Sequence, residues 1–264
     1  MSDAGQVSAS AAEVYDEFFL PALFAAWAPR VVAAAALQPG QRVVDVACGT
    51  GVLAMEAALA TSPGGHIVGV DLNPGMLAVA RRKAPKIDWL EAPAEALPFE
   101  AESFDAAVSQ FGLMFFDDKP AAIAEMWRVV RPRGRLVIAV WDSLDNTPGY
   151  SAVTSILARL FGDAVAALLK SPYSLGDPNT LRALLARAGV TDLEVQRRPG
   201  EACFPSIRAW MHSDVRGWTL ANELDDEQYE RLVAEAEVEL NRFVTADGSV
   251  RFAHPALICT AQKP

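Results

Sequence analysis

One strand followed at once by two closely spaced glycines constrains the fold of this chain most strongly. Residues 43–46 form a β-branched run that predicts a buried strand, and the apolar stretch 52–59 predicts a helix. Gly49 and Gly51 stand in the turn between the two. Glycines in such a turn let a ligand approach the backbone closely, and the first turn of the helix presents unpaired N–H groups. The segment therefore predicts a binding site at the end of the strand.

Strands and helices alternate through the rest of the centre of the chain. Further strands are predicted at 66–70, 87–91, 104–109, 135–140, 193–195 and 256–261. A helix is predicted at 120–130, and another begins at Pro74, where the Asn73 side chain is expected to cap the first turn. Repeated β-α-β units require parallel strands with helices on both faces. We therefore expect an α/β, Rossmann-like fold with a seven-stranded, mostly parallel sheet.

The length of 264 residues lies between one elaborated domain and two. Because the chain has no low-complexity linker, a single domain spanning 1–264 is expected. Its core is predicted over about 38–142, 177–198 and 250–264. The N-terminal helices at 8–37 and the insertions at 143–176 and 199–249 are predicted to form a helical cap over the substrate.

An excess of acidic residues limits the possible partners. The chain has 33 Asp and Glu residues against 23 Lys and Arg residues, and its net charge of −10 disfavours binding to nucleic acid. The cysteines show no disulfide pattern and the histidines no metal-ligand spacing, so no metal site is expected. The apolar stretch 21–37 is interrupted by Pro29 and Arg30, and the N-terminus has no signal-peptide pattern. We expect a cytoplasmic protein without a membrane span, either a monomer or a homodimer.

The glycine turn alone does not decide which ligand binds. The pattern Gly49-x-Gly51-x-x-Ala54 fits the dinucleotide fingerprint, and Asp71 follows at a distance that suits a ribose-binding carboxylate. This pattern favours NAD about as much as any other adenosyl ligand. An NAD-dependent oxidoreductase is therefore one alternative from these residues.

Further segments between residues 43 and 142 narrow the choice. They are VVDVACGTG at 43–51, GVDLNPGML at 69–77, PAEALPF at 93–99, SFDAAVSQFGLMFF at 103–116 and RVVRPRGRLVIAVWD at 128–142. Together and in this order they resemble the motifs of the class I S-adenosylmethionine-dependent methyltransferases, in particular the ubiquinone/menaquinone-biosynthesis (type 11) branch. The resemblance implies S-adenosylmethionine as cofactor, S-adenosylhomocysteine as product and a small organic molecule as methyl acceptor.

The resemblance also implies which residues surround the cofactor. They are Asp45, Ala47, Cys48, Gly49, Thr50 and Gly51 beside the methionine part, Asp71 at the ribose, Leu72, Met76 and Ala94 at the adenine, and Gln110 near the amino group and sulfonium. Tyr15, in the N-terminal helical segment, is expected to cover the cofactor. The family usually has Asp before the Ala of its third motif, where this chain has Pro93. The carboxylate for the adenine amino group is therefore either missing or supplied by Glu95.

Methyl transfer by in-line displacement requires alignment and exclusion of water, which an apolar pocket at the ends of the strands provides. Residues that directly follow the fourth or fifth strand are expected to line this pocket: Phe111, Met114, Phe115 and Trp141. In a helix, Arg208, His212 and Arg216 share one face and can attract an anionic acceptor group. His212 is also the candidate general base. The alternative for these three is a solvated or salt-bridged helix face.

Two further alternatives remain beside methyl transfer to a small molecule. An NAD-dependent oxidoreductase would lack the segments at 93–99 and 103–116. A protein of the same fold that binds the cofactor without transferring a methyl group would retain all of them. Binding of NADH, of S-adenosylhomocysteine, and formation of a methylated product distinguish the three.

Overall fold

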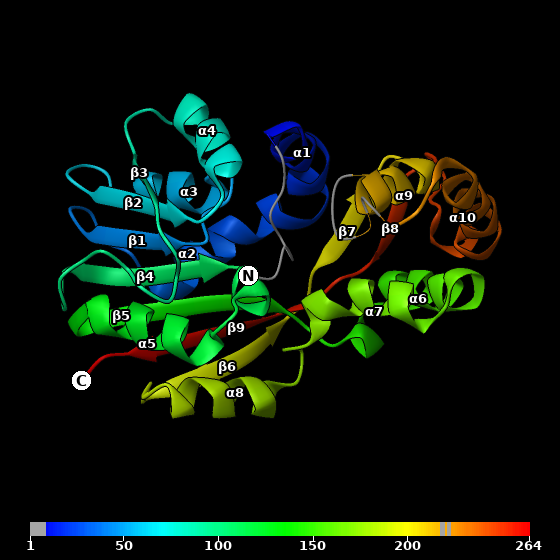
Figure 1. Ribbon diagram of the computed structural model, residues 1–264. Coiled ribbons are helices and arrows are strands. Elements are labelled where there is room, and N and C mark those ends of the chain that lie inside the picture. The colour runs from blue at the N-terminus through cyan, green and yellow to red at the C-terminus, as the bar shows by residue number, and fades with distance from the viewer. Residues whose placement is uncertain (1–8, 217–219, 221–222) are drawn as a thin grey trace.

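The computed structural model describes residues 9–216, 220 and 223–264. A seven-stranded sheet in the order β3-β2-β1-β4-β5-β9-β6 forms its centre (Figure 1). All neighbouring strands pair in parallel except β9, which is antiparallel to both β5 and β6. The mostly parallel, Rossmann-like sheet expected from the alternation is thus confirmed. Its strands are β1 (Arg42–Val46), β2 (His66–Asp71), β3 (Asp88–Glu91), β4 (Phe104–Gln110), β5 (Val130–Trp141), β6 (Leu193–Arg198) and β9 (Ala256–Gln262).

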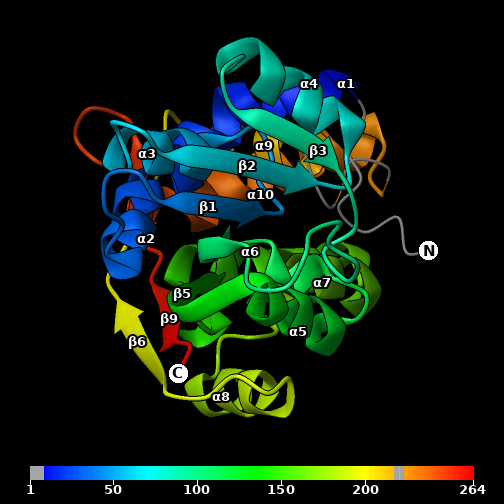
Figure 2. The ribbon, with the colours of Figure 1, turned by 90° about the vertical axis from the view of Figure 1, so that its left-hand side faces the viewer.

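Helices cover both faces of this sheet. α3 (Val52–Ala60) connects β1 to β2 and α5 (Lys119–Val129) connects β4 to β5, in opposite directions across the sheet. Right-handed crossovers therefore place these two helices on opposite faces. α2 (Ala28–Ala35) packs beside α3, and α8 (Pro178–Arg187) beside α5 (Figure 2). Between β2 and β3, α4 (Pro74–Lys83) begins as predicted, with the Asn73 side chain accepting hydrogen bonds from the next turn.

The N-terminal segment is one long helical stretch of changing geometry. α1 (Ala9–Val14) passes into a ten-residue π-helix, η1 (Tyr15–Phe24), then a 3₁₀ turn, η2 (Ala25–Trp27), and finally α2. The interior Pro21 of η1 lacks an N–H for the regular helical ladder. By length and composition alone, Ala12–Ala35 is long and apolar enough to cross a membrane, although it contains Pro29. However, 56% of its apolar window is buried inside the protein, as in a core helix.

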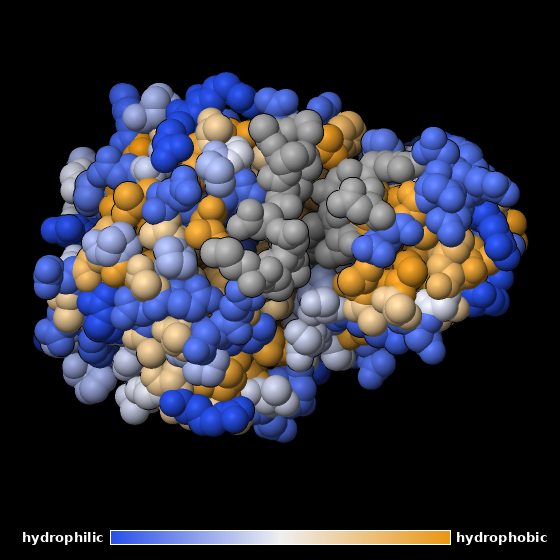
Figure 3. Space-filling view, in the orientation of Figure 1, coloured by the Kyte–Doolittle hydropathy of each residue, from blue (hydrophilic) through white to orange (hydrophobic). Residues whose placement is uncertain are grey.

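The cap lies beyond the carboxyl ends of the parallel strands (Figure 1). It contains α6 (Pro148–Phe161), α7 (Asp163–Lys170), η5 (Ser171–Tyr173), β7 (Glu201–Phe204), α9 (Ile207–Arg216), α10 (Asp226–Glu239), η6 (Asn241–Phe243) and β8 (Val250–Ala253). β7 and β8 form a separate two-stranded sheet that the sequence did not predict. β8 thus belongs to the cap and not to the core, where 250–264 was placed. Figure 3 shows apolar residues at the surface over α6 and α7 and mostly hydrophilic residues over α10.

Two chain crossings join the cap sheet to the main sheet. β6 continues into β7 through Pro199 and Gly200, and β8 continues into β9 through His254 and Pro255. The His254 N–H donates to the Gly200 carbonyl at 2.8 Å, which ties the two crossings together. A Cβ on Gly200 would lie 2.2 Å from the Trp27 ring, so only glycine fits between the crossing and the N-terminal helix. The cap is therefore held against both the edge of the sheet and η2.

Candidate cofactor and acceptor site

The turn after β1 has the backbone geometry that its glycines require. Gly49 and Gly51 have φ values of 54° and 89°, and the non-glycine Ala47 also has a positive φ of 59°. No atom lies within 4 Å of a Cβ built on Gly49, so that side of the turn is open. A Cβ on Gly51 would lie 2.4 Å from the Trp89 ring. Packing against Trp89 therefore also requires glycine at position 51, a reason that the motif did not indicate.

Asp71 lies at the end of β2 and faces this turn. Its Oδ2 accepts a hydrogen bond from the Gly49 N–H at 2.8 Å, and its Oδ1 accepts one from the Asn73 N–H at 2.8 Å. Burial raises the pKa of Asp71, while the backbone N–H groups of Asn73 and Gly49 lower it. Each carboxylate oxygen has two lone pairs. The side chain can therefore accept two further hydrogen bonds, such as those of a ribose diol.

Asp45 is buried near the carboxyl end of the central strand β1. Its side chain is 1% exposed, and neither carboxyl oxygen has a hydrogen-bond partner among the described residues. Burial raises the pKa of Asp45 well above its usual value; the nearby backbone N–H of Ala54 lowers it, and the charge of Asp71 raises it further. A buried carboxyl group without an aligned hydrogen bond is costly unless something else binds it. Asp45 is therefore suited to a ligand with hydrogen-bond donors.

Other unpartnered polar atoms gather at the same edge. Thr50 Oγ1, Ser109 Oγ and Gln110 Oε1 are buried and have no hydrogen-bond partner in the described part of the chain. Asp45 lies opposite Val108 of β4, so these side chains come from the adjoining ends of β1 and β4. The amide of Gln110 is held by its Nε2, which donates to the Phe24 carbonyl at 3.2 Å. The edge is thus lined with polar groups that can hydrogen-bond to a polar ligand.

Tyr15 lies beside these residues, as its place in the N-terminal segment suggested. Its ring packs with Met76 and Val79 of α4, and its centroid lies 5.3 Å from that of Phe24. Burial raises the pKa of Tyr15, and the charges of Asp71, Asp16 and Asp45 raise it further. The structure therefore brings Tyr15, Met76, Asp71 and Asp45 into one neighbourhood. Leu72, next to Asp71, is 50% exposed and can cover a ligand from the solvent side.

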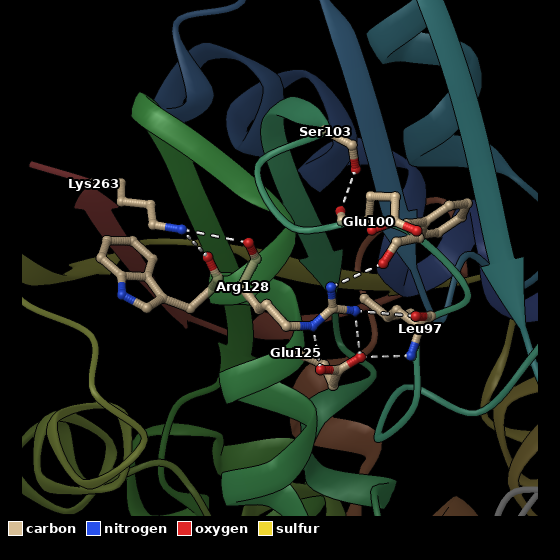
Figure 4. Close-up of polar contacts among 8 residues, drawn as sticks. Leu97, Glu100, Ser103, Glu125, Arg128 and Lys263 are labelled. Atoms are coloured by element: carbon tan, nitrogen blue, oxygen red, sulfur yellow. Dashed lines mark hydrogen bonds and ion pairs between the residues drawn. The ribbon is translucent and has the colours of Figure 1, made fainter.

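The loop with Ala94 and Glu95 is anchored by a side chain that sequence reasoning missed. Arg128 donates from Nη1 to the Phe99 carbonyl at 2.8 Å and from Nη2 to the Leu97 carbonyl at 3.1 Å (Figure 4). Glu125 pairs with Arg128 and accepts from the Leu97 N–H at 2.9 Å. The hydrogen bond from Arg128 lowers the pKa of Glu125. These contacts tie the loop to α5 and set the position of Ala94, which is buried.

Glu95 has a local structural role. Its Oε1 accepts a long hydrogen bond of 3.4 Å from the Asp118 N–H, where α5 begins. A carboxylate near a helix N-terminus is stabilised by the helix dipole. Pro93 is exposed beside it. The position of Glu95 therefore gives no support to its substituting for the Asp that the family has in place of Pro93.

Aromatic rings form a wall next to Gln110. Phe111 adopts a positive φ of 57°, and its ring stacks on Trp141 with centroids 3.6 Å apart. Trp27 contacts both rings edge-on, and Phe24 lies 5.6 Å from each. This wall brings together two of the predicted pocket residues. Of the other two, Met114 is buried and Phe115 half-buried in the 3₁₀ turn η3 (Leu113–Phe115).

The cationic face predicted on α9 lies on the outside of the cap. Arg208 makes ion pairs with Glu230 and Glu237 of α10, at 3.1 and 3.9 Å, and is half exposed. His212 is exposed, and the side chain of Arg216 lies outside the described residues. The salt-bridged alternative therefore holds for Arg208. A role for His212 as base would require an acceptor bound at the outer surface.

A buried polar group inside the cap was not predicted. His254 stacks on Trp141, and its Nε2 lies 3.0 Å from the Tyr173 hydroxyl. Tyr150 donates from its hydroxyl to Asp214 at 3.2 Å. These residues come from four distant segments, and no local spacing in the sequence connects them. Within the described residues, no group of His, Cys, Asp and Glu is arranged to hold a metal ion.

Comparison with known proteins decides the family. A methyltransferase domain family model matches residues 44–138. A demethylmenaquinone methyltransferase of Paenarthrobacter aurescens is 35% identical over 66% of this chain and 72% of its own length. The chain belongs to the class I S-adenosylmethionine-dependent methyltransferases. A second demethylmenaquinone methyltransferase, from Renibacterium salmoninarum, is 41% identical over 50% of this chain, and the match spans only 55% of that relative.

Solved structures agree with this methyltransferase fold. A Haemonchus contortus phosphoethanolamine N-methyltransferase 2 in complex with S-adenosylmethionine superposes with a TM-score of 0.64 at 21% identity, over 99% of this chain and 59% of that chain. The [4+2]-cyclase SpnF superposes with a TM-score of 0.55 at 20% identity, over 91% of this chain and 81% of that chain. At these identities the likeness concerns the fold. In this methyltransferase the unpartnered atoms of Asp45, Thr50 and Gln110 fit a cofactor with an ammonium, a carboxylate and ribose hydroxyls.

Proposed function

We propose that this protein transfers the methyl group of S-adenosylmethionine to a small, quinol-type organic acceptor. The observation that supports it is the group of buried polar atoms without partners at the adjoining ends of β1 and β4. Native proteins rarely leave such atoms unpaired, because each costs about 1–3 kcal/mol. A polar ligand bound at this edge, at the position where open α/β sheets bind ligands, provides the missing partners.

Each residue receives a role from its position. Asp71 accepts the two ribose hydroxyls, because each of its oxygens accepts one backbone N–H and has one lone pair left. Asp45 and the Oε1 of Gln110 accept from donors of the methionine part, and Thr50 donates to its carboxylate. Met76 and Tyr15 cover the adenine side. The backbone of Ala94, positioned by the Arg128 anchor, meets the adenine edge.

The turn after β1 and Leu72 complete the cofactor side. The open side of Gly49 and the positive φ of Ala47 let the turn approach the methionine part. Gly51 and Cys48 shape the turn from behind, where Cys48 is buried and Gly51 touches Trp89. Burial raises the pKa of Cys48 well above its usual value, which suits a packing residue and not a nucleophile. Leu72 shields the cofactor from solvent.

Methyl transfer places modest chemical demands on the protein. When bound, S-adenosylmethionine supplies a methyl group on a sulfonium that is already activated for displacement. The chain must hold the acceptor atom in line with that methyl carbon at about 3 Å, and such positioning supplies several kcal/mol. Phe111, directly after Gln110, and Trp141, at the end of β5, form a stacked apolar wall for this purpose. Exclusion of water by the cap protects the reacting atoms.

Two independent observations support a quinol-type acceptor. Relatives of this chain are named demethylmenaquinone methyltransferases. The wall of Phe111, Trp141, Trp27 and Phe24 suits a flat ring system, because aromatic rings prefer stacked and edge-on contacts. A quinol ring placed against this wall lies beside Gln110, where the cofactor's sulfonium is expected.

Two measurements test this function. Isothermal titration should show binding of S-adenosylhomocysteine and no binding of NADH. A screen with methyl-labelled cofactor against quinols, phenols, amines and carboxylates should transfer label to quinols. NADH binding without S-adenosylhomocysteine binding would establish an oxidoreductase. Binding of S-adenosylhomocysteine without any labelled product would instead favour a cofactor-binding protein without methyl transfer.

A further inference from the structure

Buried polar atoms without partners form two separate groups in this molecule. Apart from Asp105, those of the described residues belong either to the edge of β1 and β4 or to the cap. The cap group consists of Thr154 Oγ1, Trp210 Nε1, Asp214 Oδ2 and His254 Nδ1. All four side chains are 4% exposed or less. The cofactor of the proposed function accounts for the first group only, so the cap group requires an explanation of its own.

Tyr150 holds the cap group together. Its ring centroid lies 5.4 Å from that of Trp210 and 5.3 Å from that of His254, and its hydroxyl donates to Asp214. Trp210 and Asp214 are four residues apart on α9 and therefore share one face of that helix. Thr154 lies one turn after Tyr150 on α6. The Trp210 N–H lies near Asp214 and the Tyr150 hydroxyl and lowers the pKa of both, but it makes no aligned hydrogen bond to either. The four side chains thus come from α6, α9 and the segment after β8 and gather near a single tyrosine.

Aromatic rings connect the cap group to the proposed acceptor wall. Trp141 stacks on Phe111 with centroids 3.6 Å apart and on His254 with centroids 3.9 Å apart. Phe111 directly follows Gln110 at the cofactor edge. The cap group therefore lies at the far end of a continuous aromatic row that starts beside the cofactor.

The chemistry of the cap group favours a neutral oxygen function. Trp210 can only donate, Thr154 can donate or accept, and one nitrogen of His254 is left to do either. No lysine or arginine is among the buried side chains that the structure describes. A buried anion beside Asp214 would lack a counter-charge and would be strongly disfavoured. This differs from the anionic acceptor group that the face of Arg208 suggested.

We propose that the cap group receives a hydroxyl or carbonyl oxygen of the aromatic methyl acceptor and thereby determines acceptor specificity. This inference rests on the proposed function, because the wall that leads to the cap group is the acceptor wall. Trp210 donates to that oxygen, and Asp214 accepts from a hydroxyl or donates to a carbonyl. Tyr150 and Tyr173 keep Asp214 and His254 in position through their hydroxyls. These residues are specificity-determining and not catalytic.

The test compares two probes that differ only in the oxygen. The affinities of 1-naphthol and naphthalene are measured on protein saturated with S-adenosylhomocysteine, by quenching of tryptophan fluorescence. Wild type should bind 1-naphthol at least fivefold more tightly than naphthalene, in keeping with one neutral hydrogen bond. Trp210→Phe, which removes the N–H and keeps a ring, should lose most of this difference. Thr154→Val provides a second, nearly isosteric variant with a smaller expected loss.

A matched control removes an indole N–H elsewhere. Trp127 lies on α5, where its ring faces Lys263 outside the cap. Trp127→Phe should keep the wild-type preference for 1-naphthol. Equal affinity of wild type for both probes, or a preference that survives in both Trp210→Phe and Thr154→Val, would overturn the inference and indicate that the cap group holds only buried water. If wild type does not bind S-adenosylhomocysteine, the proposed function itself is refuted.

Discussion

The indole of Trp141 stacks on the imidazole of His254, with ring centroids 3.9 Å apart and planes inclined by 23°. One ring ends β5 of the sheet, and the other stands between β8 and β9, where the cap begins. Burial lowers the pKa of His254 to about 3, so the stacked imidazole is neutral at physiological pH. The contact between sheet and cap is therefore an uncharged aromatic one.

Asp71→Ala should weaken S-adenosylhomocysteine binding by about one to two orders of magnitude. The expected loss is that of charge-assisted hydrogen bonds worth about 1.5–3 kcal/mol. Titration calorimetry measures it. Asp88→Ala serves as the control, since Asp88 is exposed and pairs only with the surface residue His66 among the contacts found. Unchanged affinity in Asp71→Ala would remove Asp71 from the cofactor site.

Asp214→Asn should stabilise the protein at alkaline pH. Burial raises the pKa of Asp214 from 3.8 to about 8, against the weaker effects of the Tyr150 hydroxyl and the nearby Trp210 N–H. The folded state thus keeps a proton that the unfolded chain releases near pH 4. The free energy of unfolding of wild type therefore falls as pH rises from about 4 to 8, with a slope of up to about 1.4 kcal/mol per pH unit.

The measurement is thermal unfolding of both proteins between pH 5 and pH 9. The variant lacks the titrating group, so the difference in Tm in its favour should grow up to about pH 8 and then level off. The neighbouring titratable groups, Tyr150, Tyr173 and His254, stay neutral over this range, because burial raises the pKa of both tyrosines and lowers that of His254. A difference in Tm that is the same at pH 5 and pH 8 would contradict the prediction.

Gly51→Ala should destabilise the protein by more than a positive φ alone explains. The φ of 89° costs an alanine about 1–2 kcal/mol, and the clash with Trp89 adds to it. Gly189→Ala is the control, because Gly189, just after α8, has a φ of 85° with no atom within 4 Å of the added Cβ. Chemical denaturation of both variants measures the difference. If the two lose the same free energy of unfolding, Trp89 does not require glycine at position 51.

Arg128→Met should both destabilise the protein and weaken S-adenosylhomocysteine binding severalfold. The change removes two hydrogen bonds to the loop carbonyls of Leu97 and Phe99 and leaves Glu125 without its partner. We expect a loss of about 1–3 kcal/mol in the free energy of unfolding. Arg82→Met, at an exposed ion pair with Glu13, should change neither quantity. A destabilised variant with full affinity would show that the anchor does not position Ala94.

Local patterns in the sequence were sufficient to predict the sheet and the glycine turn after β1. The run 43–46 and the turn with Gly49 and Gly51 are contiguous, and a strand followed by a glycine turn has few possible structures. The cap was harder to predict. Tyr150, Tyr173, Asp214 and His254 come from separate segments, and their meeting depends on tertiary packing that no local spacing reveals.

Two contacts could not be predicted from the sequence for a common physical reason. Helical spacing left two alternatives for Arg208, an anionic acceptor or a salt-bridged face, because spacing indicates only a shared face and not what that face meets, which is Glu230. The turn predicted a close approach of a ligand at Gly51, and the structure adds a second reason for glycine, since a Cβ there would lie 2.4 Å from Trp89. In both cases the partner lies far away in the sequence.

The two crossings at 199–200 and 254–255 have a consequence for how this architecture can vary. Arg198 of β6 and Ala256 of β9 face each other as the last paired residues of adjacent antiparallel strands. A tight hairpin could therefore join them directly, and everything between them is, in terms of chain topology, an elaborated β-turn. An elaboration of this kind can lengthen, shrink or be exchanged without altering the order of the sheet. The part of the cap between β6 and β9 can thus change while the seven-stranded sheet and the turn after β1 stay the same.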